Sequence, residues 1–184
     1  MKELDRSLFL SLNFDGGPAL DSFFWHVSKG FVWIPLYALL AYLFLRRFGW
    51  RGMLLAVGAM ALAVVTADQI ANIFKYSVQK LRPTHTPEFQ GIIHTVRGYA
   101  GGLYGTVSAH AATTAAIATF ASLIFHRRWV ATLLAVWTVL VAYSRIYLGA
   151  HFPADLLFGF VDGCLLGWLG YKLFLWLDAK RQRD

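Results

Sequence analysis

The chain has 184 residues, of which 58% are hydrophobic and 15% are charged, and its formal net charge is +7. Soluble domains carry about a quarter charged residues, so this composition excludes an ordinary soluble protein and indicates an integral membrane protein. The single cysteine, Cys164, excludes an internal disulfide and a multi-cysteine metal cluster. The basic residues cluster between apolar runs, so membrane topology accounts for them and no nucleic-acid partner is expected.

The first thirty residues mix leucine and phenylalanine with charged residues, and the turn signal Asp15-Gly16-Gly17-Pro18 divides them. This pattern predicts two amphipathic interfacial helices over residues 1–30, which lie on the membrane without crossing it. One partly buried helical hairpin is the alternative.

The rest of the chain alternates between apolar and polar segments. A membrane-spanning helix needs about 20 mostly apolar residues. Five stretches qualify, and they cover residues 31–46, 52–74, 107–125, 129–148 and 153–177. We therefore expect an all-α integral membrane protein with one domain over residues 1–184 and a transmembrane bundle over 31–184. The glycine-rich segment 83–106 lacks an apolar run and is expected to form a long loop outside the membrane.

Basic clusters set the expected orientation. With five spans, the clusters within residues 46–51, 127–128 and 180–183 fall on the same side of the membrane. The positive-inside rule makes that side cytoplasmic. The protein is thus expected in the cytoplasmic (inner) membrane, with loop 83–106 and the connection 143–153 facing the periplasm or the cell exterior.

Three polar segments meet on that outer face, and their residue types suit phosphoryl transfer. Lys75, Arg82 and Arg145 are cations that can hold phosphate oxygens and stabilise charge in the transition state. Ser108 stands at a predicted helix start, where free amide groups and the helix dipole favour an anion. His110, in the first turn of the same helix, can donate a proton to a leaving oxygen.

The third segment contains a histidine and a carboxylate at helical spacing. His151 and Asp155 are four residues apart, and Pro153 is suited to the first turn of a helix. If the helix begins by His151, the two side chains share one face. A carboxylate on one imidazole nitrogen fixes the tautomer and leaves the other nitrogen free to attack.

Together these segments resemble the type 2 phosphatidic acid phosphatase superfamily, which also includes vanadium haloperoxidases. The signature of that superfamily is K-x6-RP, then PSGH, then SR-x5-H-x3-D, and the match spans Lys75 to Asp155. The first and third blocks are complete. The second reads Val-Ser-Ala-His from Val107 to His110, and the alanine at position 109 keeps its N–H but disfavours a positive φ.

The resemblance implies a role for each matching position. His151 would be the nucleophile that forms a phosphohistidine, oriented by Asp155, and His110 would be the general acid. The side chains of Lys75, Arg82, Ser108 and Arg145 would bind the phosphate. The backbone N–H of Ala109 would also bind it. No metal and no cofactor are expected.

Three further polar residues lie inside predicted spans, where such residues are costly and often functional. Asp68, Asn72 and Asp162 are candidates for supporting the site, with buried hydrogen-bonded packing as an equal alternative. Gly159, Gly163 and Gly167 recur every four residues, a spacing that permits close helix approach.

The resulting hypothesis is metal-independent hydrolysis of a phosphate monoester or diphosphate on a membrane lipid. The candidate substrates are an isoprenoid diphosphate, phosphatidylglycerol phosphate, phosphatidic acid or lipid A phosphate. The alternative is a non-catalytic phospholipid-binding or transport protein, which would need no nucleophile. The sequence predicts no oligomeric state.

Overall fold

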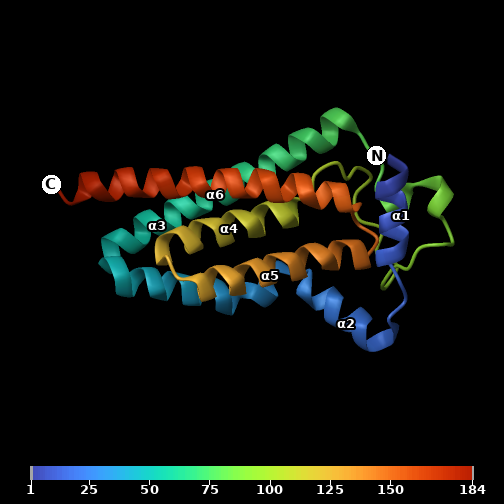
Figure 1. Cartoon of the computed structure of the whole chain (residues 1–184), viewed down its shortest axis with the longest axis horizontal. Helices are drawn as coiled ribbons and strands as arrows, with labels where there is room; N and C mark the ends of the chain where they lie inside the picture. Colours follow the sequence, from blue (N-terminus) through green and yellow to red (C-terminus); the bar gives the residue numbers. More distant parts are fainter. Residues whose placement is uncertain (1, 184) are drawn as a thin grey trace.

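The computed structural model describes residues 2–183, and this part of the chain contains helices and no β-strand. The short N-terminal helices are α1 (Lys2–Leu12) and α2 (Gly17–Val27). The long helices are α3 (Ile34–Val78), α4 (Ala109–Phe125), α5 (Arg128–Tyr147) and α6 (Pro153–Arg181). Single 3-10 turns occupy Gly30–Trp33, Pro83–His85 and Pro87–Phe89. The predicted all-α architecture is confirmed (Figure 1).

Helix α3 consists of two helical arms that meet at a break at Gly49, whose φ is 69° and ψ is −177°. Glycine adopts this left-handed φ without the clash that a side chain would make. Figure 1 shows the two arms of α3 running in opposite directions from this point, so one residue separates the stretches predicted as two spans. By length and composition, three helices can cross a membrane, Gly30–Val78, α5 and α6, while α4 is a shorter apolar helix. The count of five spans stays a prediction.

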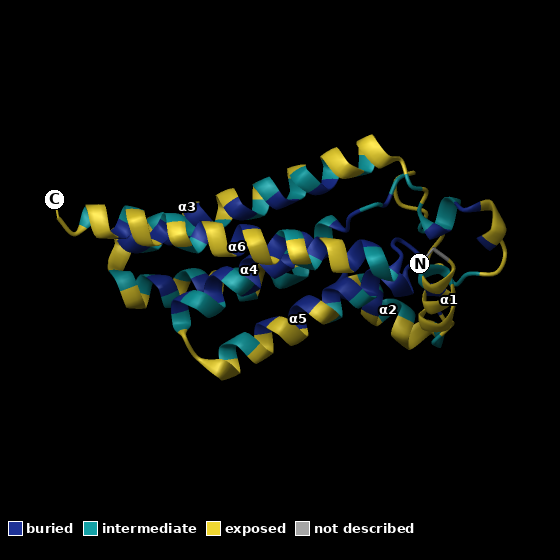
Figure 2. Ribbon diagram, turned by 45° about the horizontal axis from the view of Figure 1, so that its top comes forward, coloured by how far each residue is buried: buried dark blue, intermediate teal, exposed yellow. Residues whose placement is uncertain are grey.

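The bundle packs around α4, which lies against α3, α5 and α6. Its contact with α6 depends on glycine. A Cβ atom at Gly159 would lie 2.6 Å from the carbonyl oxygen of Ser108, and one at Gly163 would meet the carbonyl oxygen of Ala112. The predicted close helix approach at these glycines is therefore confirmed. Figure 2 shows the buried residues between the helices and exposed ones along their outer sides, where large apolar side chains such as Val161 face outwards.

Both predicted N-terminal helices are present, and α1 lies across one end of the bundle (Figure 1). Phe9 of α1 is fully buried, with its ring centroid 5.7 Å from that of Phe89 and 5.4 Å from that of Phe152. The α1 helix is thus anchored to the protein itself. Its placement on a membrane surface stays a prediction.

The two ends of the bundle differ in what they carry. The reversal of α3, the α4–α5 connection and the end of α6 lie at one end, so the three basic clusters are together (Figure 1). Helices α1 and α2, the segment after α3 and the α5–α6 connection lie at the opposite end. The three polar segments therefore converge there, as their order along the spans predicted.

Candidate active site

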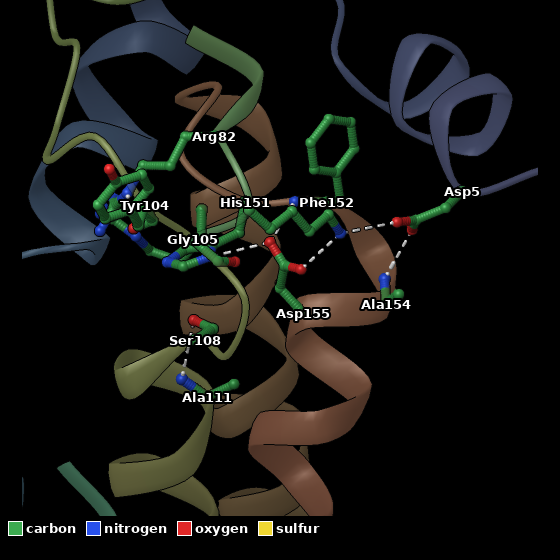
Figure 3. A network of polar contacts seen from close by, with 12 residues as sticks. Asp5, Arg82, Tyr104, Gly105, Ser108, Ala111, His151, Phe152, Ala154 and Asp155 are labelled. Atoms are coloured by element: carbon green, nitrogen blue, oxygen red, sulfur yellow. Dashed lines mark hydrogen bonds and ion pairs between the residues drawn. The ribbon is translucent and has the colours of Figure 1, made fainter. Parts of the chain in front are cut away.

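His151 is held from one side of its ring. Its Nδ1 lies 3.1 Å from the carbonyl oxygen of Gly105 and 3.2 Å from Oδ2 of Asp155. A carbonyl oxygen can only accept, so Nδ1 carries the proton and the lone pair is on Nε2. Figure 3 shows Gly105, His151 and Asp155 meeting at this point. The arrangement gives a buried imidazole with one nitrogen free for nucleophilic attack.

The pairing of His151 with Asp155 arises at the entrance to α6. The helix begins at Pro153, after His151, so the expected sharing of a helix face is replaced by a capping arrangement. Asp155 Oδ2 accepts a hydrogen bond from the backbone N–H of Phe152 at 3.1 Å and so satisfies an amide that the helix leaves free. The carboxylate that contacts the histidine also fixes the start of the helix.

The spacing between Arg145 and His151 follows from a tight turn at the end of α5. Gly149 has a φ of 70°, and the N–H of Ala150 donates to the carbonyl of Arg145 at 2.8 Å. The turn folds His151 back beside the last turn of α5. Only glycine adopts this φ readily, so the turn explains the glycine within the third block.

Two arginines converge on the site, each held by a tyrosine. Arg82 donates from Nε to the carbonyl of Tyr104 at 2.9 Å, which leaves its terminal nitrogens unused by that contact. Arg145 donates from Nη2 to the hydroxyl of Tyr99 at 2.6 Å. Its buried Nε has no hydrogen-bond partner within residues 2–183. Both guanidinium groups are thus oriented and retain donors for an anion.

Burial and the nearby cations both change the pKa of His151. Burial has the largest effect and lowers the pKa of His151 well below the ordinary histidine value, and Arg82 and Arg145 act in the same direction. The hydrogen bond to Gly105 opposes them. The resting imidazole is therefore neutral, as a nucleophile must be.

Ser108 caps α4 at the site. It is fully buried, its Oγ accepts from the N–H of Ala111 at 3.4 Å, and its own N–H donates to the carbonyl of Asp155 at 3.0 Å. Ala109 is the first residue of α4 and does not have a positive φ. The alanine at this position is therefore unstrained, and its N–H lies in the first turn of the helix.

His110 faces a different part of the site from His151. Its Nε2 lies 3.2 Å from the carbonyl oxygen of Ser28, which follows α2. A cavity of about 210 Å³ adjoins it, with Asp68 and Ala109 among the lining residues. The predicted general acid thus stands beside a space between α4 and the N-terminal part of the chain.

Two of the three predicted supporting residues join the site through Lys75. Lys75 Nζ donates to Oδ1 of Asn72 at 3.0 Å, and Asn72 Nδ2 donates to Oδ2 of Asp68 at 3.0 Å. This series of hydrogen bonds orients Lys75 on one face of α3. Asp162 is not brought to these residues. It lines an apolar cavity of about 320 Å³ between α3 and α6, and its Oδ2 is buried with no partner in the described chain.

Sequence reasoning missed two charged residues that contact the site. Lys80 Nζ lies 2.8 Å from Oδ1 of Asp155 and 3.2 Å from Oδ2 of Asp5. Lys80 falls among the six unspecified positions of the first block, and Asp5 belongs to the N-terminal helix. No local pattern relates either residue to Asp155.

Another polar cluster lies apart from His151. Asp15, Asp21 and His94 place side-chain atoms within 4.8 Å of one another, a grouping that could hold a metal ion. His94 Nε2 is 2.8 Å from Oδ1 of Asp21, and Tyr147 donates to the same oxygen at 2.6 Å. The hydrogen bond from Tyr147 lowers the pKa of Asp21. These bonds join α2, the long loop and α5, and so give the cluster a structural use.

Comparison with known proteins identifies the family of the chain. A family model described as the PAP2 superfamily matches residues 52–179. The chain is 35% identical over 187 residues to the lipid A 4'-phosphatase of Bacteroides thetaiotaomicron, covering 100% of this chain and 83% of the relative. It is 38% identical over 182 residues to the lipid A 4'-phosphatase of Porphyromonas gingivalis, covering 97% and 76%. The crystal structure of Aquifex aeolicus LpxE matches with a TM-score of 0.65 and 26% identity, covering 92% of this chain and 95% of that one.

Proposed function

The chain belongs to the PAP2 superfamily and is a multi-pass membrane lipid phosphatase, and from that premise we propose that it hydrolyses a phosphate monoester of lipid A through a phosphohistidine at His151. The observation that carries the mechanism is the buried His151, with Nδ1 held by Gly105 and Asp155 and Nε2 free. A protein that only binds phospholipid needs no such pair.

In the first step, the lone pair on Nε2 of His151 attacks phosphorus, and the bond from phosphorus to the lipid oxygen breaks. The cations Arg82, Arg145 and Lys75 stabilise the negative charge on the phosphoryl oxygens in the transition state. Asp155 stabilises the positive charge that develops on the imidazole.

His110 gives its proton to the departing lipid oxygen, which leaves as an alcohol. In the second step, His110 takes a proton from water, the water oxygen bonds to phosphorus, and the bond between phosphorus and Nε2 breaks. Inorganic phosphate leaves and His151 regains its lone pair. In this mechanism, the cavity that adjoins His110 would receive the leaving group and then the water.

The proposed substrate rests on the relatives. Two lipid A 4'-phosphatases share 35% and 38% identity with this chain over nearly its whole length. The 4'-phosphate of lipid A is a monoester of a sugar hydroxyl in a lipid with several acyl chains. Such a substrate keeps its chains in the bilayer while its phosphate reaches a site at the end of the bundle.

The test is phosphate release by purified protein from a panel of lipids. The panel contains lipid A with a 4'-phosphate only, lipid A with a 1-phosphate only, undecaprenyl diphosphate and phosphatidylglycerol phosphate. We expect the 4'-phosphate to be hydrolysed fastest, and His151→Ala to lower the rate at least about 1000-fold. Substrate labelled with ³²P should leave an acid-labile, base-stable label on the parent protein and none on the variant.

The outcomes separate substrate from mechanism. Faster hydrolysis of undecaprenyl diphosphate would make the substrate assignment wrong and leave the mechanism standing. Equal rates for the parent and His151→Ala would make the mechanism wrong. Release of phosphate from none of the lipids would favour the binding or transport alternative.

We also propose that the site faces the periplasm, since the basic clusters gather at the opposite end of the bundle. The prediction is checked with Ile92→Cys, an exposed position in the long loop, in a Cys164→Ala background. A membrane-impermeant thiol reagent should label this cysteine in cells with a permeable outer membrane and an intact inner membrane. Labelling only after the inner membrane is opened would reverse the orientation.

A further inference from the structure

Lys80 contacts the carboxylate that orients His151. Its Nζ donates to Oδ1 of Asp155 at 2.8 Å, while Oδ2 of the same carboxylate faces the imidazole. The two oxygens therefore serve two different partners. The Asp155 side chain is 1% exposed, and a carboxylate this deeply buried is costly unless it is paired with a cation.

Lys80 is itself held by the N-terminal helix. Asp5 of α1 accepts from Lys80 Nζ with Oδ2 at 3.2 Å, and its Oδ1 accepts from the N–H of Ala154 at 2.8 Å. Ala154 lies in the first turn of α6, the helix that carries Asp155. Figure 3 shows Asp5 reaching from α1 towards Ala154 and Asp155, on the side away from Arg82 and Tyr104.

The position of α1 is fixed in its C-terminal half and just beyond its end. Phe9 is fully buried between Phe89 and Phe152. Beyond the end of α1, Asn13 Nδ2 donates to the carbonyl oxygens of Ile146 and Tyr147, both at 3.0 Å. Asp5 is thus presented to Lys80 by a helix that is docked on α5 and on the α6 entrance.

We propose that Lys80 and Asp5 are positioning residues of the hydrolysis, with Lys80 holding the Asp155 carboxylate on His151 and Asp5 of α1 holding Lys80. The inference rests on the proposed roles of His151 and Asp155. It makes the docking of the N-terminal helix a condition of catalytic geometry. Lys80 binds Asp155 on the oxygen that does not face the imidazole, so it acts through the carboxylate and does not touch the phosphate.

The two roles that a cation could have here differ in steady-state kinetics. A phosphate-binding lysine raises KM when it is removed, because substrate loses a contact in the ground state. A lysine that positions Asp155 changes kcat with little effect on KM, because the carboxylate stabilises charge that develops on His151 only in the transition state.

The experiment measures kcat, KM and the single-turnover rate of phosphohistidine formation for Lys80→Met, Lys80→Arg and Asp5→Asn. Partners that orient a functional group typically contribute about 10- to 100-fold, so Lys80→Met should lower kcat and the phosphohistidine rate by about that factor with KM within about twofold. Lys80→Arg retains the cation and should restore most of the rate. Asp5→Asn removes one charge and should lower kcat by about 3- to 10-fold, a smaller effect than that of Lys80→Met because Asp5 acts through Lys80.

Arg6→Gln is the matched control on the same helix. Arg6 pairs with Glu88 at 3.6 Å near the surface, where the Arg6 side chain is 33% and the Glu88 side chain 61% exposed, so kcat of the variant should equal that of the parent. The double variant Lys80→Met with Asp5→Asn should lose no more than Lys80→Met alone, because Asp5 acts through Lys80.

Several results would overturn the inference. The inference is wrong if kcat for Lys80→Met is within twofold of the parent kcat. It is also wrong if Lys80→Met raises KM and leaves kcat unchanged. Failure of folded Lys80→Arg to recover any rate would assign the lysine a purely steric role. If Lys80→Met does not fold, Asp5→Asn provides the test. A kcat for Asp5→Asn equal to that of Arg6→Gln would refute the role of Asp5 in positioning Lys80. Activity retained by His151→Ala would instead refute the proposed mechanism.

Discussion

The Gly105→Ala substitution tests whether the backbone of the long loop sets the geometry between Arg82 and His151. A Cβ atom at Gly105 would lie 2.7 Å from Cγ of Arg82, 3.4 Å from Nδ1 of His151 and 3.5 Å from Oδ2 of Asp155. Carbon atoms in favourable contact are about 3.5–4.0 Å apart, so Arg82 must move by about 1 Å. Its guanidinium donates to the carbonyl of Tyr104, so the movement also displaces the terminal nitrogens that are proposed to bind phosphate.

A displacement of about 1 Å can cost about 100-fold in rate, so kcat/KM for lipid phosphate hydrolysis should fall by about that factor. Gly105 does not have a positive φ, so the alanine causes no backbone strain of its own. Gly102→Ala is the control in the same loop. Its Cβ would approach Arg82 only to 3.9 Å, an ordinary contact, and its kcat/KM should match that of the parent.

The assay is phosphate release in detergent micelles, with the melting temperature of each variant measured in the same buffer. The expected result is a large loss for Gly105→Ala at an unchanged melting temperature. A kcat/KM within about threefold of the control would refute the reasoning, because a displacement of Arg82 by about 1 Å would then have little effect on the rate.

Two further predictions concern charge and packing. Because burial lowers the pKa of His151, its imidazole should remain neutral as the pH falls through about 6.5. The ring-nitrogen NMR signals of His151, assigned by their absence in His151→Asn, should therefore keep the chemical shifts of a neutral imidazole at this pH. Half protonation of His151 at a pH of about 6.5 would contradict the prediction. Gly163→Ala places a methyl group against the carbonyl oxygen of Ala112 and should destabilise the protein by about 1–3 kcal/mol in a detergent unfolding assay. Gly58→Ala, whose Cβ has no neighbour within 4 Å, should not lower stability, and equal losses for the two variants would show that helix approach is not the cause.

Local rules predicted much of the fold. Hydropathy located the long helices to within a few residues, because a helix in a membrane must be apolar along its length. The predicted span ends near residue 177, and α6 continues beyond it to Arg181, where hydrogen bonds from Arg181 and Gln182 to Asp178 close the last turn. Hydropathy does not detect such polar capping. It also placed a break between the first two spans without showing that one residue, Gly49, makes the reversal.

The residues of the family blocks were predictable, and their partners were not. Spacing brings His151 and Asp155 together because four residues fit one helical turn and its cap. The contacts of Asp155 with Lys80, 75 positions away, and of Ala154 with Asp5, 149 positions away, depend on where α1 docks. Periodicity reports which face of a helix is buried and gives no information on which distant side chain covers it.

The second block shows how the site can tolerate its departure from the family signature. A glycine is required only where the backbone has a left-handed φ or where another group approaches closely. Ala109 does not have a positive φ, so the alanine costs no strain. The start of α4 is held instead by the hydrogen bond from Ser108 N–H to the carbonyl of Asp155. Because Asp155 is also the residue that contacts His151, the start of α4 and the proposed nucleophile share one anchor. Its position depends on the entrance of α6 and on the two charged residues, Lys80 and Asp5, that hold it.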